Sequence, residues 1–351
     1  MLTTQTGRLT TLLLLISLGL VGSLLNSPRA WTATAQDHEP SYEEELESAK
    51  DMLRRYRYEE ALKGFKRANE MRDKKSAECF AWMTEAYFGL EAYKNVIDSA
   101  DKTIALAGGD TRLLVKAYNN KGLALQASAE KKDQKKLQAA EAAFREGLKL
   151  QNAPAILRYN LGVVLMQQNR DEDGVAEIKQ YLKLQPKGPY AETARKLAAN
   201  PRRARENYAP DFSFTSTQGE YITLEDLKGK VVVLDFWGTW CPPCVASVPE
   251  LRNLRKRFSR EAAFVMIGVS SDRDENAWRD FTDKNRMVWP QYRDKEGRIM
   301  EAFNIRAFPT YVVIDHEGIV RFQRTGWQAP GVLDDAIKRQ IKLATQSVEA
   351  R

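Results

Sequence analysis

Residues that could hold a metal ion are scarce in this sequence. The 351 residues include three cysteines and two histidines. Two of the cysteines, Cys241 and Cys244, form a Cys-x-x-Cys pair, and a zinc site of that type needs a second pair of ligands. The remaining candidates, Cys79, His38 and His316, do not supply such a pair. We therefore predict that the protein has no metal site.

The sequence also lacks the pattern of a nucleic-acid-binding surface. Its formal net charge is +7, but acidic and basic residues are interspersed along the whole chain. No basic patch with interleaved aromatic residues is present. Interspersed charges are typical of a solvated surface, so nucleic acid is not among the expected partners.

An uncharged apolar run near the N-terminus is too short for an ordinary membrane span. It extends from Thr11 to Leu25 and follows Arg8, whereas a membrane helix needs about 20 apolar residues. Ala33-Thr34-Ala35 then provides a small-x-small cleavage pattern. We expect a signal peptide over residues 1–35 and export to the periplasm or cell envelope, where disulfides can form. An uncleaved N-terminal anchor is the alternative.

What the sequence does contain is a cysteine pair at a predicted strand-to-helix junction. The apolar run Val231–Trp237 predicts a buried strand, and the spacing of apolar residues after Pro242 predicts a helix. A helix N-terminus stabilises an anion, so the pKa of Cys241 should be lowered. Two intervening residues let Cys244 close a small disulfide ring. We interpret the two cysteines as a redox-active pair that needs no other cofactor, with a purely structural disulfide as the alternative.

Several motifs around this pair resemble those of one family. They occur in order along the chain: Ala209-Pro210-Asp211-Phe212, Leu224–Lys230, Leu234–Trp237 with Trp240–Cys244, Pro249, and Phe308-Pro309-Thr310. Together they resemble the thioredoxin superfamily, and the region looks like its exported TlpA/ResA-type branch. The resemblance implies an α/β thioredoxin fold, a mixed central sheet flanked by helices, over residues 208–345. It also implies a thiol–disulfide oxidoreductase, a protein-disulfide reductase rather than an oxidase, that receives electrons from a membrane protein.

Three residues are expected to carry the chemistry. Cys241 would attack a disulfide as a thiolate, and Cys244 would resolve the resulting mixed disulfide. Asp235 matches the buried acid of the family by position and would accept the proton of Cys244. The expected strand Phe264–Val269 has no lysine, whereas thioredoxins pair their acid with one. The alternative is that Asp235 only bonds the backbone and has no catalytic duty.

A second group of residues is expected to contact the substrate. The resemblance implies a cis peptide bond between Phe308 and Pro309, which faces the cysteines and exposes the backbone of Phe308 to a substrate segment. Trp240 is expected to form part of a flat apolar contact surface, beside Pro242 and Pro243. Client protein thiols and disulfides are therefore the expected partners of this region.

Residues 41–199 are predicted to be helical throughout, with a loose internal repeat. Tyr58-x-x-Ala61-x-x-x-Phe65-x-x-Ala68 resembles the second helix of a tetratricopeptide unit. Tyr93 stands near one repeat period, about 34 residues, after Tyr58. We predict an all-α array of about four divergent tetratricopeptide-like units, followed by a linker over residues 200–207.

Such an array is expected to recruit a protein partner, because stacked helix pairs create a groove. The alternative is that the helices only pack on the neighbouring domain or dimerise. Cys79 lies beside Phe80 and Trp82 in an expected helix, so we predict a buried, inert thiol. Mixed pairing of Cys79 with another protein is the alternative.

Three rival functions remain open on the sequence. A thiol peroxidase of the wider fold would need a threonine or serine three residues before Cys241, where Gly238 stands, although Thr239 is adjacent. A binding adaptor would carry a redox-inert C-terminal domain. A disulfide isomerase would need no external reductant but would usually call for dimerisation.

Overall fold

The computed structural model describes residues 39–130, 133–326 and 331–349. Within these ranges the chain forms two compact units that divide between Arg205 and Glu206. The expected signal peptide, residues 1–35, lies outside the described residues. None of the helices in the described ranges is both long and apolar enough to cross a bilayer.

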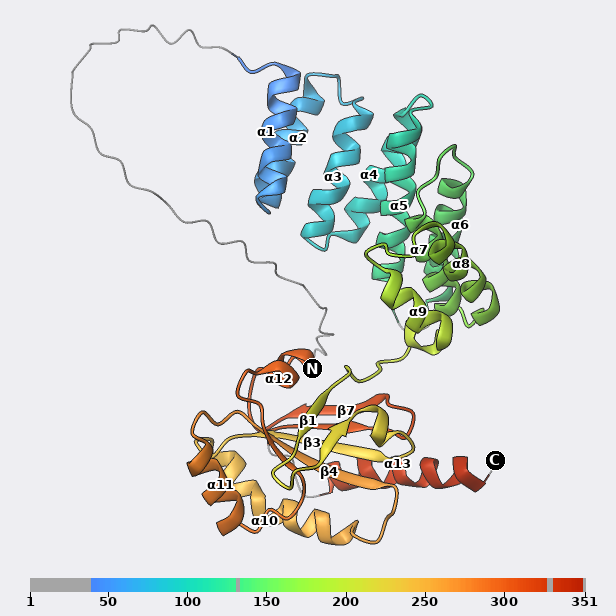
Figure 1. Cartoon of the computed structure of the whole chain (residues 1–351). Helices are drawn as coiled ribbons and strands as arrows, with labels where there is room; N and C mark the ends of the chain where they lie inside the picture. The colour runs from blue at the N-terminus through green and yellow to red at the C-terminus, as the bar shows by residue number, and fades with distance from the viewer. Residues whose placement is uncertain (1–38, 131–132, 327–330, 350–351) are drawn as a thin grey trace, which may run out of the picture. The chain divides into compact units, whose positions relative to one another are not determined.

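The first unit is an array of helices in which each helix packs mainly against its neighbours along the chain (Figure 1). Its described elements are α1 (Tyr42–Arg54), α2 (Tyr58–Glu70), α3 (Ala77–Gly89), α4 (Tyr93–Leu106), α5 (Thr111–Ser128), α6 (Gln134–Leu148), α7 (Ile156–Gln167), α8 (Asp171–Leu184), α9 (Ala191–Ala199) and the short 3-10 helix η1 (Pro201–Ala204). The predicted all-α organisation of this half is therefore confirmed. Part of the expected linker forms η1, which packs against α7 and α9.

Local sequence signals explain how these helices begin and how closely they pack. At the start of α1, the Ser41 hydroxyl accepts a hydrogen bond from the Glu44 N–H, and the Glu44 carboxylate accepts one from the Ser41 N–H. This reciprocal cap satisfies two N–H groups that a helix leaves without partners. Gly122 of α5 faces Phe144 of α6, and a Cβ on Gly122 would lie 2.5 Å from the ring. Glycine at this position lets the two helices approach closely.

The second unit alternates strands and helices. Its described elements are β1 (Ser213–Thr215), β2 (Tyr221–Thr223), the 3-10 helix η2 (Glu225–Leu227), β3 (Val231–Trp237), α10 (Pro242–Arg257), β4 (Phe264–Ser270), α11 (Glu275–Lys284), β5 (Gln291–Arg293), α12 (Arg298–Ala302), β6 (Thr310–Ile314), β7 (Val320–Thr325) and α13 (Val332–Glu349).

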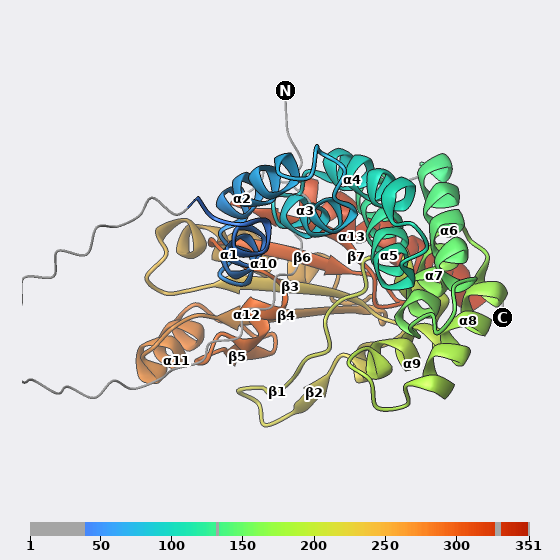
Figure 2. The same ribbon diagram turned by 90° about the horizontal axis from the view of Figure 1, so that it is seen from above.

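The main sheet has the strand order β5-β4-β3-β6-β7 (Figure 2). Strand β3 pairs in parallel with β4 and antiparallel with β6, so the sheet is mixed. All seven residues of β3 are buried, as expected for a central strand covered on both faces. The predicted mixed sheet with flanking helices is confirmed.

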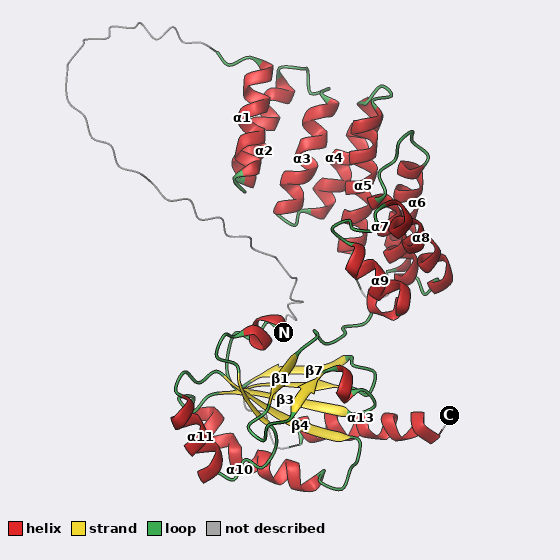
Figure 3. Ribbon diagram, in the orientation of Figure 1, coloured by secondary structure: helices red, strands yellow, loops and turns green. Residues whose placement is uncertain are grey.

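The two faces of this sheet are covered differently. Alternate side chains of β3 pack with α10, α11 and α13 on one face, which lies below the sheet in Figure 3. The other face packs against α12 and against the hairpin formed by β1 and β2. The sequence did not predict that hairpin, because two strands of three residues carry almost no periodicity. Both cysteines belong to the core on the α10 face.

Candidate active site

The predicted junction between β3 and α10 positions both cysteines. Cys241 is the N-cap of α10, with an extended backbone (φ −101°, ψ 101°), and Pro242 and Pro243 form the first helical turn. Proline is suited to this place because the first N–H groups of a helix have no intrahelical partner. The Cys241 sulfur accepts a hydrogen bond from the Cys244 N–H at 3.3 Å. A thiolate at Cys241 would therefore meet the positive end of the helix.

Cys241 and Cys244 form a disulfide, with their Cα atoms 5.2 Å apart. Both side chains are largely buried, with 4% of Cys241 and 1% of Cys244 exposed. Cys241 is thus the slightly more exposed of the two residues. The pair can exist as a closed disulfide or as a dithiol, and this interconversion is two-electron redox chemistry.

The third cysteine occupies a very different environment. Cys79 is a free thiol with no exposed surface, in the core between α1, α2 and α3. Burial raises the pKa of the Cys79 thiol. A buried, protonated thiol is a poor nucleophile, which agrees with the inert role expected for it.

An apolar surface adjoins the disulfide. Trp240 is 59% exposed, and its ring meets that of Phe308 edge-on, with the centroids 5.4 Å apart. Phe308 packs against the core that contains both cysteines. The Phe308–Pro309 peptide bond is cis, as the family resemblance implied. Within the described chain no hydrogen bond engages the backbone of Phe308, so this backbone is available to an extended substrate segment.

Asp235 lies in the middle of β3, on the same face as Val233 and Trp237 and therefore on the cysteine side of the sheet. Its side chain is 1% exposed, and within the described residues its Oδ1 atom has no hydrogen-bond partner. Burial raises the pKa of Asp235 to about 7. A carboxyl that titrates near neutral pH can hold or release a proton under working conditions, which suits acid–base catalysis.

Tyr311 links the paired strands β3 and β6 to α10, the helix that carries the cysteines. It lies directly opposite Asp235 on β6, and its hydroxyl donates a hydrogen bond to the Ser247 hydroxyl at 3.2 Å. Ser247 in turn donates to the Cys244 carbonyl at 2.7 Å. Burial, and then the nearby Asp235 carboxyl, raise the pKa of Tyr311, so Tyr311 acts as a neutral donor. The sequence analysis did not identify this residue.

On the other side of Asp235, β4 contributes Gly268. This is the strand in which the sequence analysis found no lysine to pair with the acid. The Gln291 side chain occupies the space that a side chain at Gly268 would fill, since a Cβ there would lie 2.2 Å from its Oε1 atom. Gln291 is 1% exposed, and neither Oε1 nor Nε2 has a partner among the described residues. A neutral amide therefore covers Gly268, the β4 residue that pairs with Asp235.

A buried carboxylate anchors the loop that precedes Cys241. Asp272, 4% exposed, accepts hydrogen bonds from the N–H and hydroxyl of Thr239 and from the hydroxyl of Ser270. The Thr239 hydroxyl is thus directed to Asp272, which gives no support to a peroxidase site with Thr239 beside Cys241. Sequence reasoning missed Asp272, although a polar residue just after a buried strand was a usable signal.

No group of histidine, cysteine, aspartate or glutamate side chains that could hold a metal ion occurs in the described part of the chain. A mixed sheet, a helix that begins at a redox disulfide and a cis-proline together define a protein of the thioredoxin class.

Comparison with known proteins agrees with that class. A family model described as the AhpC/TSA family matches residues 206–323. The thioredoxin-like protein YneN of Bacillus subtilis is 36% identical over 114 residues, which are 32% of this chain and 66% of YneN. The thiol-disulfide oxidoreductase ResA of Bacillus thuringiensis is 33% identical over 131 residues, covering 37% of this chain and 75% of ResA. A crystal structure of a putative thiol:disulfide interchange protein DsbE from Chlorobium tepidum has 26% identity and a TM-score of 0.37, covering 39% of this chain and 96% of that one.

The C-terminal unit of this chain thus belongs to the ResA-type thiol–disulfide oxidoreductases of the thioredoxin superfamily. The residues that the family model matches lie within the sheet unit and include Cys241 and Cys244. The protein is an oxidoreductase that carries an additional helical unit before its redox domain.

Proposed function

We propose that the protein is an exported reductase of protein disulfides in which Cys241 is the nucleophile. The observation that carries this proposal is the position of the disulfide at the first turn of α10. In the dithiol form, the Cys241 thiolate attacks one sulfur of a client disulfide, and the other client sulfur leaves as a thiolate. The helix N-terminus favours Cys241 over Cys244 for this step.

Cys244 completes the reaction. Its thiol loses a proton, its sulfur attacks the Cys241 sulfur, and the second client sulfur leaves as a thiolate. The client has gained two electrons, and the Cys241–Cys244 disulfide is restored. Asp235 is the proposed acceptor of the Cys244 proton, because its raised pKa makes it a usable base near neutral pH. No cofactor takes part in either step.

The exposed ring of Trp240 and the partly buried ring of Phe308 form the proposed client-binding surface. Trp240 and Phe308 offer apolar contact, while Pro242 and Pro243 shape the rim of the site. The free backbone of Phe308 next to the cis bond at Pro309 would pair with an extended client segment in the manner of an added strand. Specificity for proteins over small disulfides would come from this surface.

The proposal also covers the location of the protein, the direction of electron flow and the role of the helical unit. Residues 1–35 would be a signal peptide, and the reduced state would be regenerated by a membrane-bound electron donor in the periplasm or cell envelope. We assign residues 41–199 as divergent tetratricopeptide-like repeats that recruit a protein partner, residues 200–207 as a linker, and residues 208–345 as the redox domain. The helix pairs and their small, separate cores support the repeat assignment.

The trapping of a mixed disulfide tests the chemical proposal. The Cys244→Ser variant should accumulate a covalent complex between Cys241 and a disulfide-containing protein, visible on a non-reducing gel and released by dithiothreitol. The Cys241→Ser variant should not, and Cys79→Ser is the matched control because it removes the buried thiol alone. Equal trapping by Cys241→Ser and Cys244→Ser would contradict the assignment of the nucleophile.

A further inference from the structure

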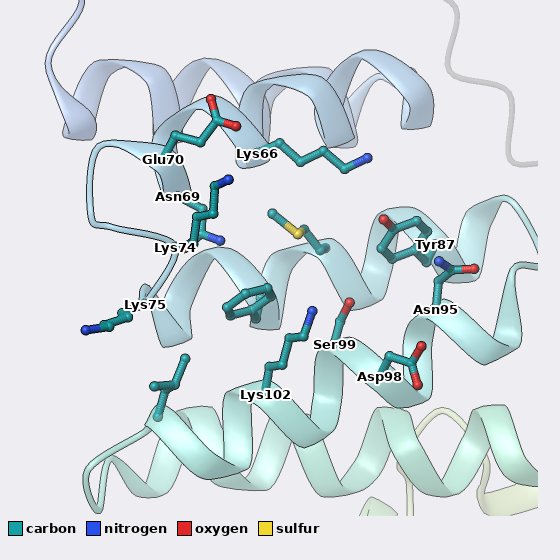
Figure 4. A pocket seen from close by; sticks show the side chains of 13 residues that line it. Lys66, Asn69, Glu70, Lys74, Lys75, Tyr87, Asn95, Asp98, Ser99 and Lys102 are labelled. Carbon is teal, nitrogen blue, oxygen red and sulfur yellow. The ribbon is translucent and has the colours of Figure 1, made fainter.

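A groove runs between α2 and α4 in the helical unit, and α3 forms its floor (Figure 4). Its volume is about 530 Å³. The floor is apolar, with Phe80 and Met83 almost fully buried and Tyr87 partly so. We call this feature the α2–α4 groove. It lies apart from the redox disulfide in the chain and takes no part in the chemistry described above.

Charged side chains surround the groove unevenly. Its charged lining residues are Lys66, Lys74, Lys75, Lys102, Glu70 and Asp98. None of these six forms an ion pair with any other described residue, in contrast to the many paired charges elsewhere on these helices. Lys66 extends from α2 and Lys102 rises from α4 towards the middle of the opening in Figure 4, whereas Lys75 points away at one end. The lining therefore carries an excess of positive charge that the helical unit itself does not neutralise.

Two buried polar side chains add hydrogen-bond donors beneath the lysines. Asn69 of α2 and Ser99 of α4 are 5% and 6% exposed, and both line the groove. The Asn69 Oδ1 atom accepts a hydrogen bond from the Ser76 N–H, but no hydrogen bond of its Nδ2 group or of the Ser99 hydroxyl occurs among the described residues. Neither atom is among the fully buried side-chain atoms that lack a hydrogen-bond partner, so both donors are open to the groove. A ligand in the groove can accept hydrogen bonds from them, alongside its contacts with the lysines.

We propose that the α2–α4 groove binds an acidic segment of a partner protein. Carboxylates of that segment would pair with Lys66 and Lys102, and a carbonyl or carboxylate oxygen would accept from Asn69 and Ser99. An apolar side chain next to the carboxylates would rest on Phe80 and Met83. This inference rests on the proposed recruiting role of the helical unit and specifies its site and the chemistry of the partner.

The apolar floor favours a peptide over other anions. A polyanion without apolar groups would meet only the exposed lysines, and contacts between exposed charges are weak and screened by salt. A segment that combines carboxylates with an apolar residue would contact both the lysines and the apolar floor of the groove. Charge complementarity would then set the rate and specificity of binding, while the buried anchor would set its lifetime.

The test uses the full-length protein and a defined probe. The probe is a fluorescein-labelled peptide of about twelve residues with glutamates on both sides of one central leucine. We expect saturable binding in fluorescence anisotropy that weakens as salt is raised. Lys66→Glu combined with Lys102→Glu should weaken binding at least ten-fold, and Leu106→Ser, at an exposed apolar position of the lining, should weaken it less.

Lys63→Glu combined with Lys179→Glu is the matched control. Both lysines are exposed helix residues outside the groove, so the pair changes net charge equally and should leave binding unchanged. The proposal is wrong if both double variants weaken binding alike, or if a peptide with serine in place of leucine binds as well. Trapping by Cys244→Ser, measured in parallel, separates the two ideas: intact trapping with no peptide binding would overturn the groove alone.

Discussion

The two units of this protein differ in how far apart in the sequence their contacting elements lie. In the helical unit, each helix packs mainly against the helices next to it in sequence. In the sheet unit, β3 pairs with β6, far later in the chain, so that Asp235 lies opposite Tyr311. The first unit is built from local contacts and the second from distant ones.

This difference bears on where the chemistry can lie. A catalytic site needs several functional groups from separate parts of the chain in one place, and the sheet brings Asp235, Cys241, Gln291 and Tyr311 together on one face or at its edge. The helical array instead repeats similar surfaces, which suits binding along its length. A substitution in the array should therefore act locally, whereas one at the centre of the sheet should affect both stability and reactivity.

The strongest test of this contrast is Phe65→Ala in α2. Phe65 is fully buried in the same core as Cys79, and the loss of such a ring costs about 3–5 kcal/mol. The helical unit should then open far more often and expose Cys79, so labelling of Cys79 by a thiol reagent should accelerate by about 100-fold or more. Reduction of a small synthetic disulfide by the Cys241–Cys244 pair should remain unchanged.

Phe65→Leu is the control for this prediction, since it nearly preserves the apolar contact. Its Cys79 labelling rate should stay close to that of the unaltered protein. A parallel loss of disulfide reduction in Phe65→Ala would show that the units do not respond independently, and the contrast between them would fail.

The sequence predicted most of what local patterns encode. The apolar run before Trp240 and the periodicity after Pro242 predicted β3 and α10 with their order and junction, and the fold class of both halves is confirmed. The buried position of Asp235 also followed from its apolar neighbours, although its catalytic role stays a prediction. In the helical half, the resemblance of Tyr58–Ala68 to the second helix of a tetratricopeptide unit predicted the helix that begins at Tyr58.

What the sequence could not predict depends on distant pairing. Gln291 covers Gly268, the β4 residue that pairs with Asp235, only because β5 pairs with β4 at that point, and no local pattern reveals that register. The sequence did not single out Tyr311, because its hydrogen bond to Ser247 joins two elements that are far apart in the chain. The α2–α4 groove escaped notice because lysines on three neighbouring segments look like ordinary surface residues until the helices are packed.

Asp235→Asn tests the expectation that a substitution at the centre of the sheet changes both stability and reactivity. Because burial raises the pKa of Asp235 to about 7, against about 3.9 in an unfolded chain, folding favours the protonated form. The stability contributed by this group is full below pH 4, declines as pH rises towards 7, and is lost above it. Relative to the unaltered protein, Asp235→Asn should therefore gain on the order of 2–4 kcal/mol between pH 4 and pH 8.

Denaturant unfolding of the oxidised protein at the two pH values measures this gain. The same variant should slow the resolving step by about 100-fold, the range typical of a lost general base, with mixed disulfides accumulating near neutral pH. Asp272→Asn is the comparison. The Asp272 carboxylate is hydrogen-bonded in the folded protein, so its replacement should bring no such gain in stability at high pH. A resolving rate for Asp235→Asn equal to that of the unaltered protein would remove Asp235 from the mechanism.

The smallest effect should come from Gln291→Leu, which keeps the volume of the side chain but removes its amide. Because the amide atoms of Gln291 lack partners among the described residues, the substitution should change the unfolding free energy by no more than about 1 kcal/mol. A drier neighbour should disfavour the charged carboxylate further, so the pH midpoint of the resolving step should move upwards. Gln323→Leu on β7, which lies opposite Val312 and thus on the other face of the sheet, should leave the midpoint in place. An unchanged midpoint in Gln291→Leu would mean that burial alone sets the pKa of Asp235 and that the Gln291 amide has no influence on it.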